Sequence, residues 1–333
     1  MKALIVSEFG GPDVLQWREV EDPIPGPGEA LVRTGGFAVN WADLMQRQGK
    51  YPGGPVPPFP SGHDLMGVVV AHGPGVDTPP IGARVFGVLG HSGAAAEYVS
   101  VPTHWLHAAP STVSDEEAAG LASPFFTADT ALVTFGRLQP GDNVLIHAAA
   151  GGLGSAAVQL ARAYGAATII ATAGSDAKLE RVREWGADVL VNYTTDSFVE
   201  PTMEATAGRG VDLVVDSVGG DVLGDSFDCL APLGRLVSVG ATSLSSSRRF
   251  RLHTLFEKHI SVAGFTLGLM MVNQPDILVP GARRVLEQLE KESVRPVVGG
   301  VFTAEDAPMA HRFMEDRKSV GRTIVMLSQP ETG

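Results

Sequence analysis

The stretch from Asn143 to Lys178 constrains the fold of this chain more than any other. Val144–His147 is a short apolar run, typical of a buried parallel strand, and Ala148–Gly154 is a turn made almost entirely of small residues. Ser155–Tyr164 then carries apolar residues at helical spacing, and Thr168–Ala171 is a second apolar run. Strand, glycine turn, helix and strand together predict a right-handed βαβ unit.

The glycine turn of this unit predicts a binding site for a dinucleotide cofactor. In the G-x-G-x-x-G register its three positions are Ala149, Gly151 and Gly154, so alanine replaces the first glycine. Small residues let the backbone approach a pyrophosphate, and the helix start offers N–H groups and the positive end of its dipole. The simpler alternative is that glycine only lets the helix pack closely on the strand. The position between two strand-like runs favours cofactor binding.

The end of the second strand bears on the choice between NADH and NADPH. NAD-binding units place an acidic residue about 20 residues after the glycines, where it holds the ribose 2′-hydroxyl. Here Thr172–Ser175 contains no acid, and the hydroxyl of Ser175 and the nearby Lys178 suit a 2′-phosphate. Asp176 argues against this, and Lys178 also fits an ordinary solvated helix position. The residues by themselves leave both cofactors equally possible.

Composition excludes several classes of protein. The chain has 333 residues, 44% of them hydrophobic, which is enough for two domains. Its net charge is −12 and it has no basic tract, so nucleic acid and anionic membranes are poor partners. The single cysteine, Cys229, excludes a disulfide framework and fits a reducing cytoplasm. No apolar run reaches about 18 residues, so we expect no membrane span, and the apolar N-terminal run is too short for a signal peptide.

The order of the predicted elements divides the chain into three parts. Residues 1–122 combine short strands with Pro/Gly turns, which is typical of a partly open β-barrel. Residues 123–258 alternate strand and helix, which predicts a doubly wound parallel sheet, and Ser243–Arg251 in this part is expected to be a polar loop. Residues 259–333 are expected to begin with a further strand over His259–Thr266 and then to return to the first domain. The strands expected in the first part are Lys2–Phe9, Ala30–Val39, Val68–Ala71, Arg84–Val88 and Ala95–Val101, with a helix over Asn40–Gln48. After the βαβ unit we expect strands at 189–192, 211–217, 235–239 and 323–327 and helices at 198–206, 222–230, 281–291 and 304–317.

Several motifs together resemble the zinc-independent quinone oxidoreductases, the zeta-crystallin-like branch of the medium-chain dehydrogenase/reductase superfamily. The motifs are Asn40-x-x-Asp43 followed by Gly49-x-Tyr51, Phe126-Thr127-Ala128, His147–Gly154, Gly174-Ser175-x-x-Lys178, Asn192-Tyr193, Asp216–Gly219 and Gly321-Arg322. The resemblance implies a GroES-like barrel with a Rossmann domain, NADPH as cofactor, and the reduction of quinones or activated alkenes. It also implies a homodimer that pairs through the strand around His259–Thr266.

The resemblance also implies a set of site residues. Asn40 and Tyr51 would be the polar groups nearest the nicotinamide, with Asn40 orienting ribose or substrate and Tyr51 donating a proton. The alternatives are a helix N-cap for Asn40, a loop anchor for Tyr51 and water as the proton donor. The cofactor would be bound by Asn40, Thr127, Ala150, Gly151, Gly152, Leu153, Gly154, Gly174, Ser175, Lys178, Tyr193, Ser217, Val218, Gly240, Phe265, Leu267 and Arg322.

No metal is expected. Zinc-dependent relatives place a cysteine where Asn40 stands and a His-Glu pair where His63-Asp64 stands. A catalytic zinc needs three protein ligands and an open position, and an amide is a poor ligand. We therefore expect His63 to be a hydrogen-bonded structural residue.

The acceptor is the least constrained part of the function. Many relatives carry an aromatic residue where Met45 stands, so quinones compete with 2-alkenals, enones and enoyl thioesters as candidate substrates. Phe59, Leu89 and Leu267–Met271 would form the pocket wall, or else simply pack in the core. The other functional classes left open are a non-enzymatic NADPH-binding protein and a zinc-free alcohol or sugar dehydrogenase.

Overall fold

The computed structural model describes residues 1–243, 245 and 252–327, and it divides into two compact units. Unit 1 comprises Met1–Ser123 and the chain from Pro296 onward, and unit 2 comprises Pro124–Arg295. Among the described residues, no helix is both long enough and apolar enough to cross a membrane.

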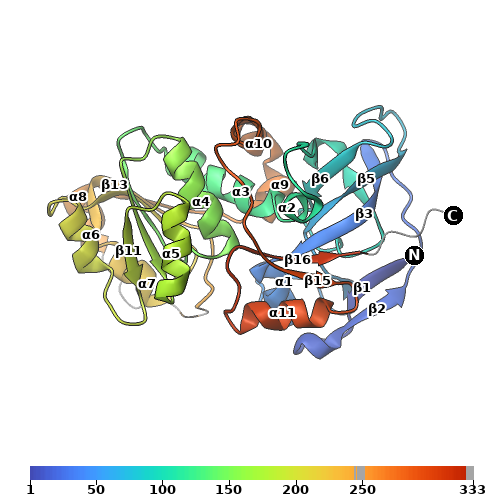
Figure 1. Ribbon diagram of the computed structural model, residues 1–333, viewed down its shortest axis with the longest axis horizontal. Helices are drawn as coiled ribbons and strands as arrows, with labels where there is room; N and C mark the ends of the chain where they lie inside the picture. The colour runs from blue at the N-terminus through green and yellow to red at the C-terminus, as the bar shows by residue number, and fades with distance from the viewer. Residues whose placement is uncertain (244, 246–251, 328–333) are drawn as a thin grey trace. The chain divides into compact units, whose positions relative to one another are not determined.

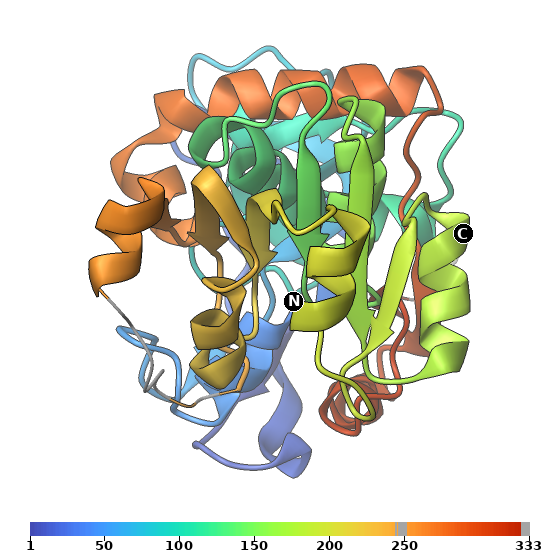
Figure 2. The same ribbon diagram turned by 90° about the vertical axis from the view of Figure 1, so that its left-hand side faces the viewer.

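Unit 2 is built on a parallel sheet with the strand order β11-β10-β9-β12-β13-β14, in which all neighbouring strands are parallel. This is the expected doubly wound arrangement, in which the chain reverses direction across the sheet at β9 and β12. Figure 2 shows these strands side by side with helices lying against them. The strands are β9 (Asn143–Ile146), β10 (Thr168–Ala173), β11 (Val189–Asn192), β12 (Val211–Asp216), β13 (Leu230–Ser238) and β14 (Ser261–Gly264).

Helices cover both faces of this sheet, which is why all six residues of β12 are buried. In Figure 1, α4 and α5 lie on one side of the strands, and α6 and α8 lie on the other. The core on the second side includes Leu145, Ile170, Val214 and Phe227. The helices that follow the strands are α4 (Gly152–Ala163), α5 (Asp176–Glu184), α6 (Val199–Ala205), α7 (Gly220–Ser226) and α8 (Leu252–Lys258).

A buried ion pair attaches the last helices of unit 2 to the rest of it. Asp129 lies at the end of α3 (Ala122–Asp129), which continues as a π-helical segment over Thr130–Phe135. Its carboxylate accepts hydrogen bonds from Arg284 Nε at 3.0 Å and from the Tyr164 hydroxyl at 2.8 Å. Arg284 lies on α10 (Pro275–Glu290), which follows α9 (Leu267–Asn273). Because this contact holds α10, the chain returns to unit 1 only from Pro296, so the part expected over residues 259–333 is divided between the two units.

Unit 1 contains a mixed, largely antiparallel sheet with the order β15-β16-β3-β5-β6-β8, with β7 also paired to β3, and a smaller sheet with the order β2-β1-β4. Its core includes Leu4, Phe37, Leu44, Phe59 and Val325. In Figure 1 the chain from Pro296 onward, in red, supplies β15, β16 and α11 to this unit. The strands are β1 (Lys2–Val6), β2 (Leu15–Glu19), β3 (Glu29–Val39), β4 (Phe59–Pro60), β5 (Asp64–His72), β6 (Arg84–Val88), β7 (Tyr98–Pro102), β8 (Leu106–Ala108), β15 (Val298–Thr303) and β16 (Arg322–Met326); the helices are α1 (Trp41–Arg47), α2 (Asp115–Ala119) and α11 (Ala307–Glu315).

The structure differs from the sequence-based expectation at a few elements. Strand β15 was not among the expected strands, and it contains Gly299 and Gly300. A Cβ at Gly299 would lie 1.7 Å from the carbonyl oxygen of Val320, so the close approach of two chain segments requires glycine there. Strand β13 begins at Leu230 rather than Arg235, because it continues across a register shift opposite Val211 and Leu213. Most of the expected loop over residues 243–251 lies outside the described residues.

Candidate functional site

The glycine turn of unit 2 presents a helix start at the carboxyl end of β9. Ala148 has a left-handed backbone with φ 50°, and Ala149 N–H donates to the carbonyl oxygen of Thr172 at 2.8 Å. Gly151 is the N-cap of α4, and no side chain caps this helix. A helix start without a side-chain cap can bind an anion through its backbone N–H groups.

The glycines of this turn have different reasons to be glycine. A Cβ at Gly154 would lie 2.4 Å from both Ala148 O and Ala149 Cα, so this position allows α4 to pack closely on the turn. A Cβ at Gly151 would meet only Ala148 O, at 3.4 Å, which is an ordinary contact. Packing within unit 2 therefore explains Gly154 but not Gly151. In a dinucleotide-binding turn, a glycine at such a position lets a pyrophosphate approach the backbone.

The residues expected at a 2′-phosphate gather where β10 and β11 end. Ser175 is the N-cap of α5, and its Oγ accepts a hydrogen bond from Lys178 N at 3.4 Å. The hydroxyl of Tyr193 would lie 2.7 Å from a Cβ at Gly174, so glycine is needed for the ring to lie there. Asp176, which argued against NADPH, accepts a hydrogen bond from Asn192 Nδ2 at 2.8 Å.

The other expected cofactor residues of unit 2 follow further strands of the same sheet. The carboxylate of Asp216 accepts the N–H of Val218 at 2.8 Å and fixes the turn after β12. A Cβ at Gly240, after β13, would lie 3.1 Å from Ser217 O, so these two turns are adjacent. Phe265, after β14, stacks on Phe135 with 4.9 Å between the ring centroids. The remaining expected residues are Ala150, Gly152 and Leu153 in the glycine turn, Thr127 on α3 and Leu267 at the start of α9.

His147 is a buried polar residue behind this edge of the sheet. Its Nδ1 lies 3.1 Å from Thr172 Oγ1 and its Nε2 lies 2.9 Å from Ser226 Oγ. Burial lowers the pKa of His147 to about 3, so the imidazole is neutral. It therefore supports the strand ends and supplies no charge.

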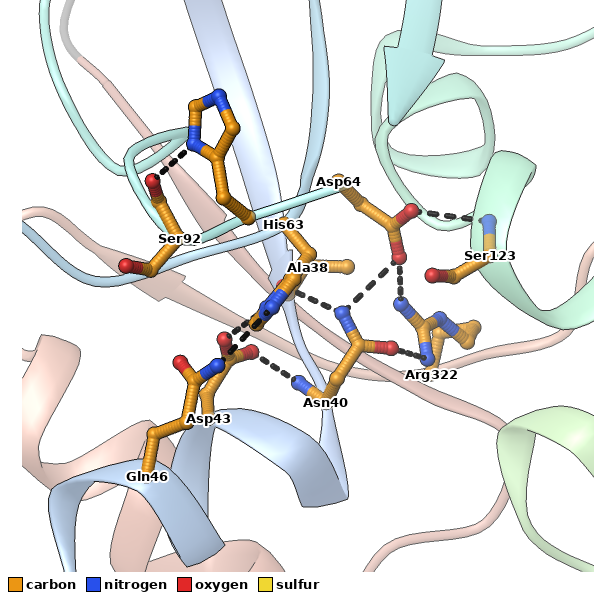
Figure 3. Close-up of polar contacts among 10 residues, drawn as sticks. Ala38, Asn40, Asp43, Gln46, His63, Asp64, Ser92, Ser123 and Arg322 are labelled. Atoms are coloured by element: carbon orange, nitrogen blue, oxygen red, sulfur yellow. Dashed lines mark hydrogen bonds and ion pairs between the residues drawn. The ribbon is translucent and has the colours of Figure 1, made fainter. Parts of the chain in front are cut away.

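Asn40 belongs to unit 1, at the N-cap position of α1 (Figure 3). Its backbone N–H donates to Asp43 Oδ2 at 2.7 Å. Its amide oxygen accepts from Arg322 Nη1 at 3.0 Å, and its amide nitrogen donates to Asp64 Oδ2 at 3.1 Å. Both ends of the Asn40 amide are thus held inside the unit.

Arg322 and Asp64 form a buried ion pair beside Asn40. Arg322 Nη2 lies 2.5 Å from Asp64 Oδ2, and Ser123 N–H donates to Asp64 Oδ1 at 2.9 Å. Burial raises the pKa of Asp64 and lowers the pKa of Arg322, and in each the partner's charge opposes this effect. Arg322 was expected to bind the cofactor, and in unit 1 its guanidinium contacts Asp64 and Asn40.

Asp43 also holds His63, with 2.6 Å between Asp43 Oδ1 and His63 Nδ1. Burial lowers the pKa of His63, but the charge of Asp43 and the hydrogen bond to it outweigh burial, so this pKa lies above its ordinary value. Tyr51 is half-buried. Burial is the larger cause that raises the pKa of its phenol, and the negative charge of Asp43 raises this pKa further. The pairing of Asp43 with His63 could not be read from the sequence.

The donors at this position do not fit a catalytic zinc. The amide of Asn40 is a weak ligand, and Arg322 already supplies a positive charge to Asp64. Among the described residues, no group of three or more His, Cys, Asp or Glu side chains is arranged to hold a metal ion.

The expected pocket wall is divided between core and surface. Phe59 and Leu89 are buried, and Phe59 is part of the core of unit 1. Met270 and Met271 are buried in unit 2, whereas Leu269 is exposed. For Phe59, packing in the core is a sufficient explanation, as the alternative interpretation of these residues proposed. Met45, which bears on the choice of acceptor, is half-buried on α1.

Comparisons with known proteins match both units. The family model for an alcohol dehydrogenase GroES-like domain matches residues 26–111, and the model for a zinc-binding dehydrogenase matches residues 152–277. A 2-haloacrylate reductase from Burkholderia sp. is 34% identical over 98% of this chain and 99% of its own length. The synaptic vesicle membrane protein VAT-1 homolog from Homo sapiens is 33% identical over 98% of this chain and 86% of its own.

Solved structures match over nearly the whole chain as well. A quinone oxidoreductase from Pseudomonas syringae is 31% identical, with a TM-score of 0.88 over 98% of this chain and 99% of that one. A mycobacterial protein solved in complex with NADPH is 31% identical, with a TM-score of 0.88 over 98% of this chain and all of that one.

Proposed function

The chain belongs to the zinc-independent quinone oxidoreductase branch of the medium-chain dehydrogenase/reductase superfamily, and from this premise we propose that it is an NADPH-dependent reductase of quinones or other conjugated carbonyl compounds. Membership of this family makes it an oxidoreductase that uses a nicotinamide cofactor. The observation that carries the proposal is the edge of the unit 2 sheet, where Gly151, Ser175 and Tyr193 follow successive strands.

NADPH is the proposed cofactor because the end of β10 offers no carboxylate for a ribose 2′-hydroxyl. Ser175, Lys178 and Tyr193 would hold the 2′-phosphate, and the N–H groups at the start of α4 would hold the pyrophosphate. The Asp176 carboxylate is engaged with Asn192, which reduces its repulsion of a phosphate. When bound, NADPH supplies a hydride. The mycobacterial neighbour bound to NADPH supports this choice.

Activity without zinc is part of the proposal. A conjugated acceptor spreads the incoming negative charge onto an oxygen, so hydrogen bonds and positioning can replace a Lewis acid. Asn40 is assigned a positioning role, because its amide holds Arg322 and Asp64 in place. Tyr51, half-buried near Asp43, is retained as a residue that contacts the acceptor.

Two classes of acceptor remain in the proposal. Quinones follow from the family, whereas 2-alkenals, enones or enoyl compounds follow from Met45, whose flexible thioether stacks less well on a flat ring. The 2-haloacrylate reductase relative, whose name denotes a conjugated substrate, supports the second class.

The test is NADPH oxidation with 1,4-benzoquinone, 9,10-phenanthrenequinone, an enone and a 2-alkenal, with NADH in parallel and a chelator as control. We expect turnover with NADPH that the chelator does not change. Turnover of the enone or alkenal alone would assign the protein to alkene reduction. Tight NADPH binding with no turnover would instead favour the non-enzymatic alternative, and loss of activity with the chelator would contradict zinc independence.

We also propose a homodimer that pairs through β14 and the residues around it, His259–Thr266. β14 lies at the end of the six-strand order of unit 2, so one of its edges has no partner strand among the described residues. Val262 on this strand is 44% exposed. An exposed edge of this kind pairs readily with a second copy.

A further inference from the structure

We propose that the pair formed by Asp43 and His63 supplies the proton that completes the reduction, with His63 as the acid and Asp43 as the residue that positions and charges it. This inference rests on the proposed function. It concerns residues of unit 1 alone.

The geometry of the pair is well defined. Asp43 uses both carboxylate oxygens: Oδ2 accepts the N–H of Asn40 at 2.7 Å, and Oδ1 lies 2.6 Å from His63 Nδ1. The Asp43 side chain is 1% exposed, whereas that of His63 is 12% exposed. The aspartate is therefore enclosed, and the imidazole is the member of the pair that reaches the surface of unit 1.

The second ring nitrogen of His63 has only a long contact among the described residues. Gln46 Nε2 is 3.4 Å from His63 Nε2, which is longer than most hydrogen bonds, whereas Asp43 holds Nδ1 at 2.6 Å. Nε2 is therefore the ring nitrogen that an acceptor could approach, and an imidazolium would carry its second proton there.

The charges around His63 favour the same form. Asp43 on α1 and Asp64 on β5 both raise the pKa of His63 against the effect of burial. His311 on α11 acts on Asp43, and Arg47 on α1 acts on His311. Burial lowers the pKa of His311 to about 4, so it is neutral at pH 7.

The other acids nearby are less suited to donate. Burial and the charge of Asp43 raise the pKa of Tyr51, which makes its phenol a weaker acid. The bonds from His63 and Asn40 outweigh burial and lower the pKa of Asp43, so it carries no proton at pH 7. Among these groups, His63 is the stronger protonated acid near neutral pH.

In the proposed step, bound NADPH would supply the hydride, with the C4–H bond of its dihydronicotinamide breaking and NADP⁺ left behind. The hydride would bond to the electrophilic carbon of the acceptor, and the electron pair of the conjugated bond would move to the carbonyl oxygen. The Nε2–H bond of His63 breaks, and its proton bonds to that oxygen or, for an enolate, to the α-carbon. His63 is left neutral with Nδ1–H donating to Asp43, and it takes up a proton from water before the next cycle.

The first test is His63→Gln, measured with the acceptor that the wild type reduces best. We expect kcat to fall about 100-fold or more, while the Kd for NADPH, measured by fluorescence, and the KM for the acceptor change little. In the wild type kcat should decrease as the pH rises through the pKa of His63, and the variant should lose this decrease.

The second variant, Asp43→Asn, keeps an oxygen to accept the Asn40 N–H but removes the charge. We expect its decrease in kcat to begin at a lower pH than in the wild type, because the pKa of His63 falls. An NMR titration of the imidazole C–H resonance, assigned by its absence in His63→Gln, should show the same shift without any turnover. The pH profile of Asp43→Asn, which needs no resonance assignment, decides the question even if His63→Gln does not fold.

The outcomes separate this inference from the proposed function. If the wild type reduces the acceptors but His63→Gln keeps its kcat and pH profile, the inference fails and the proposed function stands. An unchanged His63 titration in Asp43→Asn would also overturn it. A wild type that binds NADPH but reduces no acceptor would contradict both.

Discussion

Individual buried polar residues decide the chemistry that each unit can perform. Asn40, Asp64 and Arg322 hold one another in unit 1, so the position that could have held a metal instead holds a guanidinium. Removing Arg322 would leave the Asp64 carboxylate buried without a counter-charge, which typically costs about 3–5 kcal/mol. The same pattern recurs in unit 2, where Arg284 neutralises the buried Asp129.

Lys178→Ala tests the assignment of the 2′-phosphate. A charge-assisted hydrogen bond is worth about 1.5–3 kcal/mol, so the Kd for NADPH should rise roughly 10- to 100-fold while that for NADH changes little. Fluorescence titration of both cofactors measures this. Lys291→Ala, at the exposed C-terminal end of α10, is the matched control and should change neither Kd. Equal weakening of both cofactors would show that Lys178 does not contact the phosphate.

Because His147 is buried, we expect the free energy of unfolding to depend on pH in the acidic range. Burial lowers its pKa to about 3, so below the ordinary value of about 6.5 the unfolded chain binds a proton that the folded chain does not. Stability therefore falls as the pH falls, by about 1.4 kcal/mol per pH unit for this residue. His63 adds no slope between pH 4 and 5.5, because its raised pKa leaves it protonated in both states.

The measurement is urea unfolding of the wild type and His147→Gln between pH 4 and 5.5. The variant should lose about 1.4 kcal/mol per pH unit of the slope, whatever its absolute stability. His253→Gln, which removes an exposed histidine, should keep the wild-type slope. A His147→Gln slope equal to that of the wild type would contradict a neutral buried imidazole.

At the scale of elements, the junction of β9 and α4 combines two requirements in one short turn. The backbone must bend sharply, as the left-handed Ala148 shows, and the helix must then lie against the turn that precedes it. Gly154 meets the second requirement, and Gly151 keeps the helix start accessible. Stability and binding are therefore separable by substitution within four residues of the chain.

The pair Gly154→Ala and Gly151→Ala tests this separation. Gly154→Ala places a methyl group 2.4 Å from the Ala149 backbone, so we expect a loss of several kcal/mol in unfolding free energy or failure to fold. Gly151→Ala meets only an ordinary contact and has φ −81°, so its melting temperature should stay close to that of the wild type. Its affinity for NADPH should fall at least 10-fold, because the methyl group occupies the approach of the pyrophosphate. If Gly151→Ala is stable and binds NADPH with the wild-type affinity, the pyrophosphate does not bind at this turn.

At the scale of the whole molecule, each unit ends its main sheet in an exposed edge strand. β14 is the edge of the unit 2 sheet and β15 is the edge of the larger unit 1 sheet. Val262 and Val301 on these strands are 44% and 52% exposed. The proposed homodimer uses only one of these edges. It pairs through β14, which lies within His259–Thr266, and it leaves the exposed edge of β15 unpaired.

Val262→Lys tests which edge is used. A lysine on an edge strand opposes pairing with another strand, so sedimentation at micromolar concentration should change from dimer to monomer. Val301→Lys places the same charge on the other edge and should leave the dimer intact. A wild-type monomer would reject the proposal, and dissociation by Val301→Lys alone would move the interface to β15.

Local sequence patterns were enough to predict the elements around the glycine turn and a dinucleotide cofactor. The apolar runs, the glycine turn and the helical spacing between Asn143 and Lys178 are local patterns, so they predicted β9, α4 and β10 and their role. Contacts between residues far apart in the chain became visible only in the folded protein. The chain from Pro296 onward returns to unit 1, and Gly299 on β15 lies close to the backbone of Val320. Asn40 contacts Arg322, and Asp43 contacts His63. Such contacts depend on how strands from both ends of the chain align in one sheet, and no local pattern of residues encodes that alignment.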